Sequence, residues 1–208
     1  MDALQSIKNN KLVAVIRNVK ESDVISVGEA LLEGGIKVFE ITAESSNFLS
    51  SIERVKSEFG KEVTVGAGTV LDPETAKSAI HVGAEFIFSP TINIETIKLT
   101  KRYGVVSIPG AMTPTEILTA YEHGADIIKV FPANIIGPNF IKDVHGPLPQ
   151  IPLMPTGGVN LNNIQEYFTN GAIAAGLGNA LVNTSVTIDE NELLQIKKRA
   201  KQYIEKLS

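Results

Sequence analysis

Residues 11–42 read KLVAVIRNVKESDVISVGEALLEGGIKVFEIT, and they contain a strand, a helix and a second strand in succession. The outer segments, KLVAVIRN and KVFEIT, are short runs rich in β-branched residues. Between them, Val24, Val27 and Leu31 recur at helical spacing, and Gly34 and Gly35 signal the end of the helix. The pattern therefore predicts a β–α–β unit.

The alternation of strand and helix continues along the chain in about eight cycles of roughly 20–30 residues each. The segments that we predict as strands are 11–18, 37–42, 63–69, 85–90, 105–110, 126–133, 152–158 and 173–178. The segments that we predict as helices are 21–35, 47–59, 72–83, 93–103, 113–124, 138–144, 161–169 and 190–206. The strands are near-continuous apolar runs, which is typical of parallel strands covered on both faces.

Two of the predicted helices carry clear starting signals. Asp72 stands before Pro73 as an N-cap residue, with the proline at the first helical position. Thr113 stands before Pro114 in the same way, and Glu116 completes a capping box with Thr113.

This order of elements predicts an α/β protein whose residues 1–208 form a single domain, a (β/α)8 TIM barrel with an N-terminal helix. A doubly wound open sheet is the structural alternative. Its Gly-x-Gly-x-x-Gly fingerprint is missing, because GAGTVL at residues 66–71 lacks the third glycine. We therefore interpret that stretch as a strand end and expect the barrel.

The composition limits the function classes. The formal net charge of −4 argues against nucleic acid or an anionic membrane surface as the main partner. The chain has no cysteine and only three scattered histidines, which excludes thiolate chemistry and argues against a metal site built on histidine. We see no signal peptide and no apolar run approaching the roughly 20 residues of a membrane span, so we expect a soluble, cytoplasmic protein.

Polar residues stand where the predicted strands end, and in a barrel the carboxyl ends of the strands carry the active site. In strand order these residues are Arg17, Glu40, Thr69, Ser89–Pro90, Lys129, the PTGG segment 155–158 and the GLGN segment 176–179. We expect them to meet at one mouth of the barrel.

Lys129 and Glu40 are ionisable residues inside apolar runs, IIKVF and VFEIT. A buried lysine must be paired or neutral, and a neutral lysine attacks carbonyl groups to form Schiff bases. Glu40 could move the proton that enamine formation requires. The alternatives are that the two residues form a buried salt bridge, or that Lys129 points to a wet rim. We expect burial to lower the pKa of Lys129 unless a close pairing with Glu40 offsets it.

The glycines of PTGGV, Gly157 and Gly158, could let backbone N–H groups approach a phosphate, helped by the following helix N-terminus. They could equally make only a tight turn. Arg17 could hold a carboxylate, or it could be an ordinary surface residue. Thr69 and Ser89 could contact a substrate, or they could cap the helices that follow them.

Seven segments resemble, in order and spacing, the class I 2-keto-3-deoxy-6-phosphogluconate (KDPG) aldolases, a family that includes the bifunctional enzymes that also cleave 4-hydroxy-2-oxoglutarate. They are GGIKVFEIT, VGAGTVLDPE, FIFSP, IPGAMTPTEI, IKVFPA, GPNFIKDVHGPLPQIPLMPTGGVN and GLGNALV. The resemblance implies a (β/α)8 barrel, a homotrimer, no metal or other cofactor, and cleavage of a 2-keto-4-hydroxy acid to pyruvate and an aldehyde.

The resemblance also implies roles for single residues. Lys129 matches the Schiff-base lysine of the family, and Glu40 matches its general acid/base. Arg17 would hold the pyruvyl carboxylate. The residues that match the lining of the pyruvyl pocket and the surroundings of the aldehyde-side phosphate are Thr69, Pro90, Thr156, Gly157, Gly158, Gly178 and Asn179.

Two departures from the family pattern bear on the substrate. Many members carry EVTLRT at the second strand, whereas this chain has EITAESS, which puts Glu44 where that arginine would stand. The eighth-strand GxGS is GLGN here, with Asn179 in place of serine.

Two other functions remain as alternatives. A phosphosugar isomerase or epimerase on the same fold would use Glu40 as the base and would form no covalent intermediate. A non-catalytic barrel could bind a phosphorylated acid as a sensor.

Overall fold

The computed structural model describes residues 2–208. Its strands are β1 (Leu12–Ile16), β2 (Val38–Thr42), β3 (Thr64–Gly68), β4 (Phe86–Phe88), β5 (Val106–Ile108), β6 (Gly110–Ala111), β7 (Ile128–Val130), β8 (Leu153–Pro155) and β9 (Ala175–Leu177). Its helices are α1 (Ala3–Asn10), α2 (Val24–Glu33), α3 (Phe48–Phe59), α4 (Pro73–His81), α5 (Ile94–Arg102), α6 (Pro114–Glu122), α7 (Ala133–Ile136), α8 (Asn139–His145), α9 (Ile164–Thr169) and α10 (Glu190–Lys206). The predicted alternation of strands and helices is confirmed.

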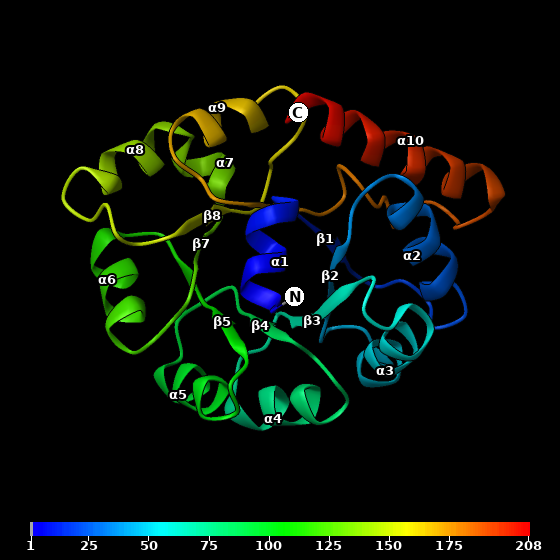
Figure 1. The fold of residues 1–208 in the computed structure, drawn as a ribbon, viewed down its shortest axis with the longest axis horizontal. Helices are drawn as coiled ribbons and strands as arrows, with labels where there is room; N and C mark the ends of the chain where they lie inside the picture. The colour runs from blue at the N-terminus through cyan, green and yellow to red at the C-terminus, as the bar shows by residue number, and fades with distance from the viewer. Residues whose placement is uncertain (1) are drawn as a thin grey trace.

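The strands form two parallel sheets. One is a curled six-stranded sheet in the order β5-β4-β3-β2-β1-β9, and the other has the order β6-β7-β8. A single parallel bridge between Thr156 and Gly176 connects the end of β8 to β9. In Figure 1 the strands lie around the middle of the molecule, and the helices that follow α1 surround them.

The prediction of an α/β architecture is confirmed, but in residues 2–208 the hydrogen-bonded ladders do not form one closed ring of eight strands. The stretch 105–110, which we predicted as one strand, is divided into β5 and β6 at Pro109. Proline has no backbone N–H to give to a ladder, which accounts for a break at this residue.

Buried apolar side chains form two clusters, because successive residues of a strand point to opposite faces. The larger cluster joins the outward faces of the strands to the helices, as Leu12, Phe39 and Leu31 illustrate. The smaller cluster consists of Ile7, Val13, Val38, Phe86, Phe88, Val106, Ile108, Ile127, Met154 and Ala174. Its members come from both sheets and from α1, so we call it the interior cluster.

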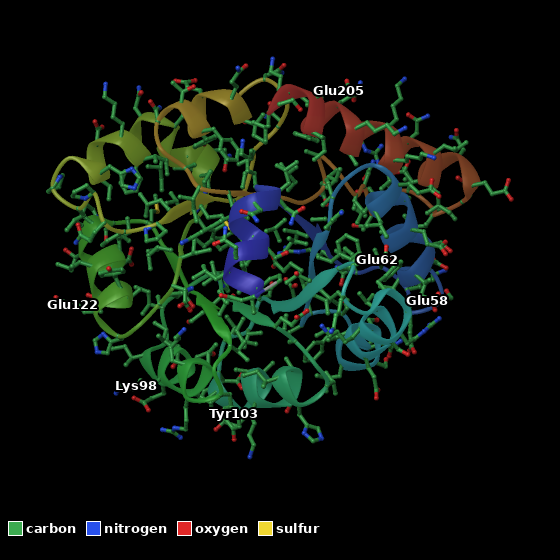
Figure 2. The ribbon with its side chains drawn as sticks, viewed as in Figure 1. Glu58, Glu62, Lys98, Tyr103, Glu122 and Glu205 are labelled. Carbon is green, nitrogen blue, oxygen red and sulfur yellow. The ribbon has the colours of Figure 1, made fainter. Side chains whose placement is uncertain are left out.

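Helix α1 packs on the interior cluster through Ile7, which is fully buried, with Ala3 and Leu4 beside it. Figure 1 shows α1 lying across the centre of the molecule, within the circle of the other helices. Most charged side chains lie on the outside of the molecule. In Figure 2, Glu58, Glu122 and Glu205 lie at its edge and point outward.

The helix starts predicted at Asp72 and Thr113 are confirmed. The side chain of Asp72 accepts a hydrogen bond from the N–H of Thr75 at 2.6 Å, and Thr113 and Glu116 form a capping box at the start of α6. By contrast, α9 begins at Ile164, three residues later than the predicted start at Leu161.

Candidate active site

The residues predicted at the strand ends come together around a cavity of about 310 Å³. Eight of the ten candidates line it: Arg17, Glu40, Lys129, Thr156, Gly157, Gly158, Gly178 and Asn179. The carboxyl ends of parallel strands meet at one edge of a sheet, which is why residues so distant in sequence meet here. Residues that the sequence reasoning did not select, including Val15 and Phe131, also line the cavity.

A larger cavity, of about 640 Å³, lies near the amino ends of the strands, beside α1. Lys37, Thr64 and Glu85 are among its lining residues, and it contains neither Lys129 nor Glu40. We therefore assign the chemistry to the smaller cavity, where two buried ionisable groups converge.

Lys129 lies in β7, between Gly110 of β6 and Met154 of β8. Only 4% of the residue is exposed. Burial lowers the pKa of Lys129 below its ordinary value, and the negative charge of Glu40 opposes this change. The predicted direction is confirmed, so a larger fraction of the amine is neutral and nucleophilic than in an exposed lysine.

Glu40 lies in β2, paired with Val15 of β1 and Gly66 of β3. It is 1% exposed, and its Oε2 has no hydrogen-bond partner within residues 2–208. Burial raises the pKa of Glu40 to about 7, while the positive charge of Lys129 acts in the opposite direction. A carboxyl group in this range can both take and give a proton near neutral pH.

The two residues do not form a salt bridge. Among residues 2–208, no ion pair within 4.0 Å joins Lys129 to Glu40, although each changes the pKa of the other. The alternative of a directly paired buried Lys–Glu couple is therefore wrong. The alternative of a wet rim is also wrong for Lys129, because its side chain is buried.

The PTGG segment turns sharply beside the cavity. Gly157 and Gly158 have φ values of 90° and 76°, in the left-handed region that favours glycine. The side-chain amide of Asn163 donates to the carbonyl oxygen of Gly158 at 3.0 Å, which holds the turn. Within the part of the chain that the structure describes, the N–H group of Gly158 donates to no protein acceptor, whereas the bridge between Thr156 and Gly176 directs the N–H group of Gly157 toward β9. One backbone donor, that of Gly158, is thus free to bind an anion.

The structure does not support a helix dipole at this turn. Because α9 begins only at Ile164 and has six residues, its first turn is well removed from Gly158. Any anion site here consists of the loop donors and their neighbours.

A family model described as KDPG and KHG aldolase matches residues 4–199. The chain belongs to this family. Its members are aldolases, which are lyases, so the protein is an aldolase by descent.

Comparisons with individual aldolases support the assignment to this family. The chain is 32% identical over 199 residues to the 2-dehydro-3-deoxy-phosphogluconate aldolase of Pseudomonas aeruginosa, covering 95% of this chain and 90% of the relative. It is 32% identical over 179 residues to the 2-dehydro-3-deoxy-6-phosphogalactonate aldolase of Escherichia coli, covering 86% and 87%. The crystal structure of the KDPG aldolase from Legionella pneumophila, with pyruvate captured at low pH as a covalent carbinolamine intermediate, superimposes with a TM-score of 0.89 at 26% identity, covering 97% of each chain.

Glu44, which stands where many aldolases of the family have an arginine, contacts Arg17. Their side chains form an ion pair of 3.5 Å, with 46% and 38% of the two side chains exposed. Glu44 thus does more than remove a positive group that many aldolases carry. It contacts the very arginine that is expected to hold the pyruvyl carboxylate.

Thr69 and Pro90, which the aldolase resemblance assigns to the pyruvyl pocket, are not among the residues that line the cavity. Thr69 directly follows β3 and has a φ of 55°, which is unusual for a β-branched residue. The alternative of helix capping is wrong for Thr69 and for Ser89, because Asp72 caps α4 and Asn93 caps α5. The pocket roles of Thr69 and Pro90 stay predictions.

The described residues were compared with the requirements of a metal site and of a membrane span. Across residues 2–208 no three His, Asp or Glu side chains gather in a way that could hold a metal ion. In the same residues no helix is long and apolar enough to cross a membrane.

Sequence reasoning missed three residues at this site. Gly68 leaves the space in which the Glu40 carboxyl group lies. Phe88 and Phe131 place their rings against Lys129. A signal was available for two of them: Gly68 lies two positions after Gly66 on the same strand face, and Phe131 lies two positions after Lys129.

Proposed function

We propose that the protein is a class I aldolase that cleaves KDPG, 4-hydroxy-2-oxoglutarate or both to pyruvate and an aldehyde. The aldehyde would be glyceraldehyde 3-phosphate or glyoxylate. The observation that carries the proposal is the pair of buried groups in one cavity: burial lowers the pKa of Lys129 and raises the pKa of Glu40. A nucleophilic amine and a proton carrier with a pKa near neutrality are what Schiff-base cleavage requires.

The reaction begins when the neutral Nζ of Lys129 attacks the C2 carbonyl of the substrate. Loss of the C2 oxygen as water leaves a positively charged imine, which accepts electrons from the C3–C4 bond. Glu40, directly or through a water molecule, takes the proton of the C4 hydroxyl group as that bond breaks, and the aldehyde leaves. The enamine is then protonated at C3, and water hydrolyses the imine to release pyruvate.

The remaining candidates would orient the substrate. Arg17 supplies a guanidinium fork for the pyruvyl carboxylate, with Thr69 and Pro90 beside it. The free N–H group of Gly158 supports an anion site for a phosphorylated aldehyde, with Thr156, Gly157, Gly178 and Asn179 around it.

The mechanism is tested by trapping. The protein is incubated with pyruvate and borohydride and then digested for mass analysis. We expect a reduced pyruvate adduct on the Lys129 peptide, no adduct and no cleavage activity in Lys129→Ala, and full activity in Lys142→Ala, a lysine of α8 that does not line the cavity. Activity retained in Lys129→Ala would overturn the proposal. An isomerase or epimerase would give turnover without any adduct, and a sensor would bind keto acids without turnover; the relatives named as aldolases favour neither.

The substrate class is tested by comparing kcat/KM for phosphorylated and unphosphorylated 2-keto-4-hydroxy acids. A strong preference for the phosphorylated acid is expected if Gly157 and Gly158 bind the phosphate. Equal values would leave these glycines as a turn.

We also propose that the two sheets close into one (β/α)8 barrel and that residues 1–208 are a single domain. The bridge between Thr156 and Gly176 supports contact at one junction of the sheets, and the single residue Pro109 separates them at the other. The interior cluster, which draws on both sheets, gives further support. A single cooperative unfolding transition seen by both fluorescence and circular dichroism is expected.

We further propose a homotrimer that acts in the cytoplasm and does not bind nucleic acid. Family resemblance supports the trimer, and large exposed apolar side chains such as Ile135 and Leu194 support burial of surface between copies. The net charge of −4 opposes binding to nucleic acid. Sedimentation equilibrium should give three times the chain mass of 22.3 kDa.

A further inference from the structure

The Nζ atom of Lys129 lies over the faces of two aromatic rings. It is 4.5 Å from the ring centroid of Phe88 and 4.7 Å from that of Phe131. Both distances are within the roughly 6 Å at which a ring face attracts a cation. Phe88 lies in β4 and is fully buried, and Phe131 directly follows β7, so the rings come from two different sheets.

Among the described residues, no polar protein group competes with these rings for the nitrogen. Within residues 2–208, Nζ makes no hydrogen bond to a protein group and no ion pair. The charged groups that influence it act from a greater distance: Glu40 from β2, Arg17 from the end of β1 and Glu44 from the loop after β2. Burial opposes a positive charge at this position, whereas the two ring faces favour one.

We propose that Phe88 and Phe131 are positioning residues that hold the positive charge on the Lys129 nitrogen while it is covalently bound to the substrate. This inference rests on the proposed aldolase function. When the neutral amine adds to C2 and one proton is taken up, the C2 oxygen leaves as water and the nitrogen keeps one hydrogen and the positive charge. The charge therefore stays beside the rings through imine formation.

The rings suit this step because their attraction does not depend on N–H donors. An ammonium group has three N–H bonds, and a protonated imine has one. Acceptors that bind the ammonium group would lose most of their hydrogen bonds when the imine forms, whereas the negative face of a ring attracts either cation. The two rings thus favour the protonated imine in a pocket whose burial alone would disfavour it.

The test is a series of ring-fluorinated phenylalanines at position 88 of the full chain, because each fluorine weakens the negative ring face with little change in shape. Phe88 is chosen because Phe131 also packs on Gly157. The amount of imine formed with pyruvate is measured by borohydride trapping across pH. We expect stepwise losses that reach about tenfold in the imine equilibrium constant at the trifluorinated ring, and a parallel decrease in the apparent pKa of imine formation.

Phe59 provides the matched control, since its ring packs edge-to-face on Phe39 at 6.2 Å and no cation–ring contact involves it in the described residues. Fluorination at Phe59 should change neither quantity. Phe88→Leu should reduce imine formation about as much as full fluorination, and Phe88→Tyr should restore it.

The outcomes distinguish this proposal from the aldolase function itself. If pyruvate is trapped on Lys129 equally well across the fluorinated series, the rings only fill space and the proposal is overturned, while the aldolase function stands. If the unsubstituted protein traps no pyruvate on Lys129, the proposed function fails and this inference fails with it.

Discussion

The Oε1 atom of Glu40 occupies the space in which any side chain at position 68 would have its Cβ, and the residue there is glycine. The two residues lie on neighbouring strands, β2 and β3. Because Gly68 has no side chain, the Glu40 carboxyl group can take its position across the ladder between β2 and β3.

Gly68→Ala should displace the Glu40 carboxyl group without unfolding the protein. We expect kcat/KM for cleavage to fall about 100-fold, because a shift of about 1 Å in a reacting group has an effect of this size. Gly146→Ala, at the end of α8, is the control and should retain activity. The idea fails if Gly68→Ala is as active as the control, with circular dichroism confirming that both are folded.

The pH dependence of cleavage should report Glu40. Burial raises the pKa of Glu40 to about 7, and the proposed mechanism uses its charged form as the base. The value of kcat/KM should therefore rise with pH and level off above about pH 7, and this limb should be lost in Glu40→Gln. A rise of kcat/KM centred near pH 4.5, the ordinary pKa of glutamate, would contradict the argument that burial raises the pKa of Glu40.

Glu40 should also affect stability in a defined pH window. Its pKa is about 7 in the folded protein and about 4.5 when unfolded, so between these values the folded protein binds a proton that the unfolded chain does not. The unfolding free energy should thus decrease by up to about 3 kcal/mol as pH rises from 4.5 to 7. Glu40→Gln should lack this decrease, and Glu58→Gln, a surface control, should retain it. Urea denaturation at several pH values measures it; parallel curves for all three proteins would refute it.

Glu44→Gln should free Arg17 for the substrate. Because the two side chains are about half exposed, the ion pair is weak, and we expect the KM for pyruvate in the condensation direction to fall about threefold. High salt should shrink this difference. Glu21→Gln breaks the similarly exposed pair with Arg54, which is 3.7 Å long, and should leave KM unchanged. An unchanged KM in Glu44→Gln would show that the ion pair does not compete with pyruvate.

Much of the fold could be predicted because its signals are local. Helical spacing of apolar residues and the caps at Asp72 and Thr113 located helices correctly. The division of a strand at Pro109 and the number of ladders could not be predicted in the same way. They depend on how strands from opposite ends of the chain meet, which no short window of sequence contains.

At the site, too, local signals could be predicted from the sequence, but contacts between distant segments could not. Lys129 and Glu40 could be selected because each interrupts an apolar run, and the order of the strands was enough to bring them to one cavity. Their separation, the ring of Phe88 beside the amine and the pairing of Arg17 with Glu44 could not be foreseen. Such contacts depend on strand register and tilt to within an ångström or two.

Helix α1 has a consequence for the kinetics of the reaction. Helix α1 packs on the interior cluster through Ile7, and the cavity beside α1 contains neither Lys129 nor Glu40, so the cavity at the carboxyl ends of the strands is the route for exchange. Pyruvate stays covalently attached at the deep end of that route, while the aldehyde lies nearer the exit. Cleavage should therefore follow an ordered sequence, with the aldehyde leaving first, and pyruvate should be the product that competes with substrate for the free enzyme.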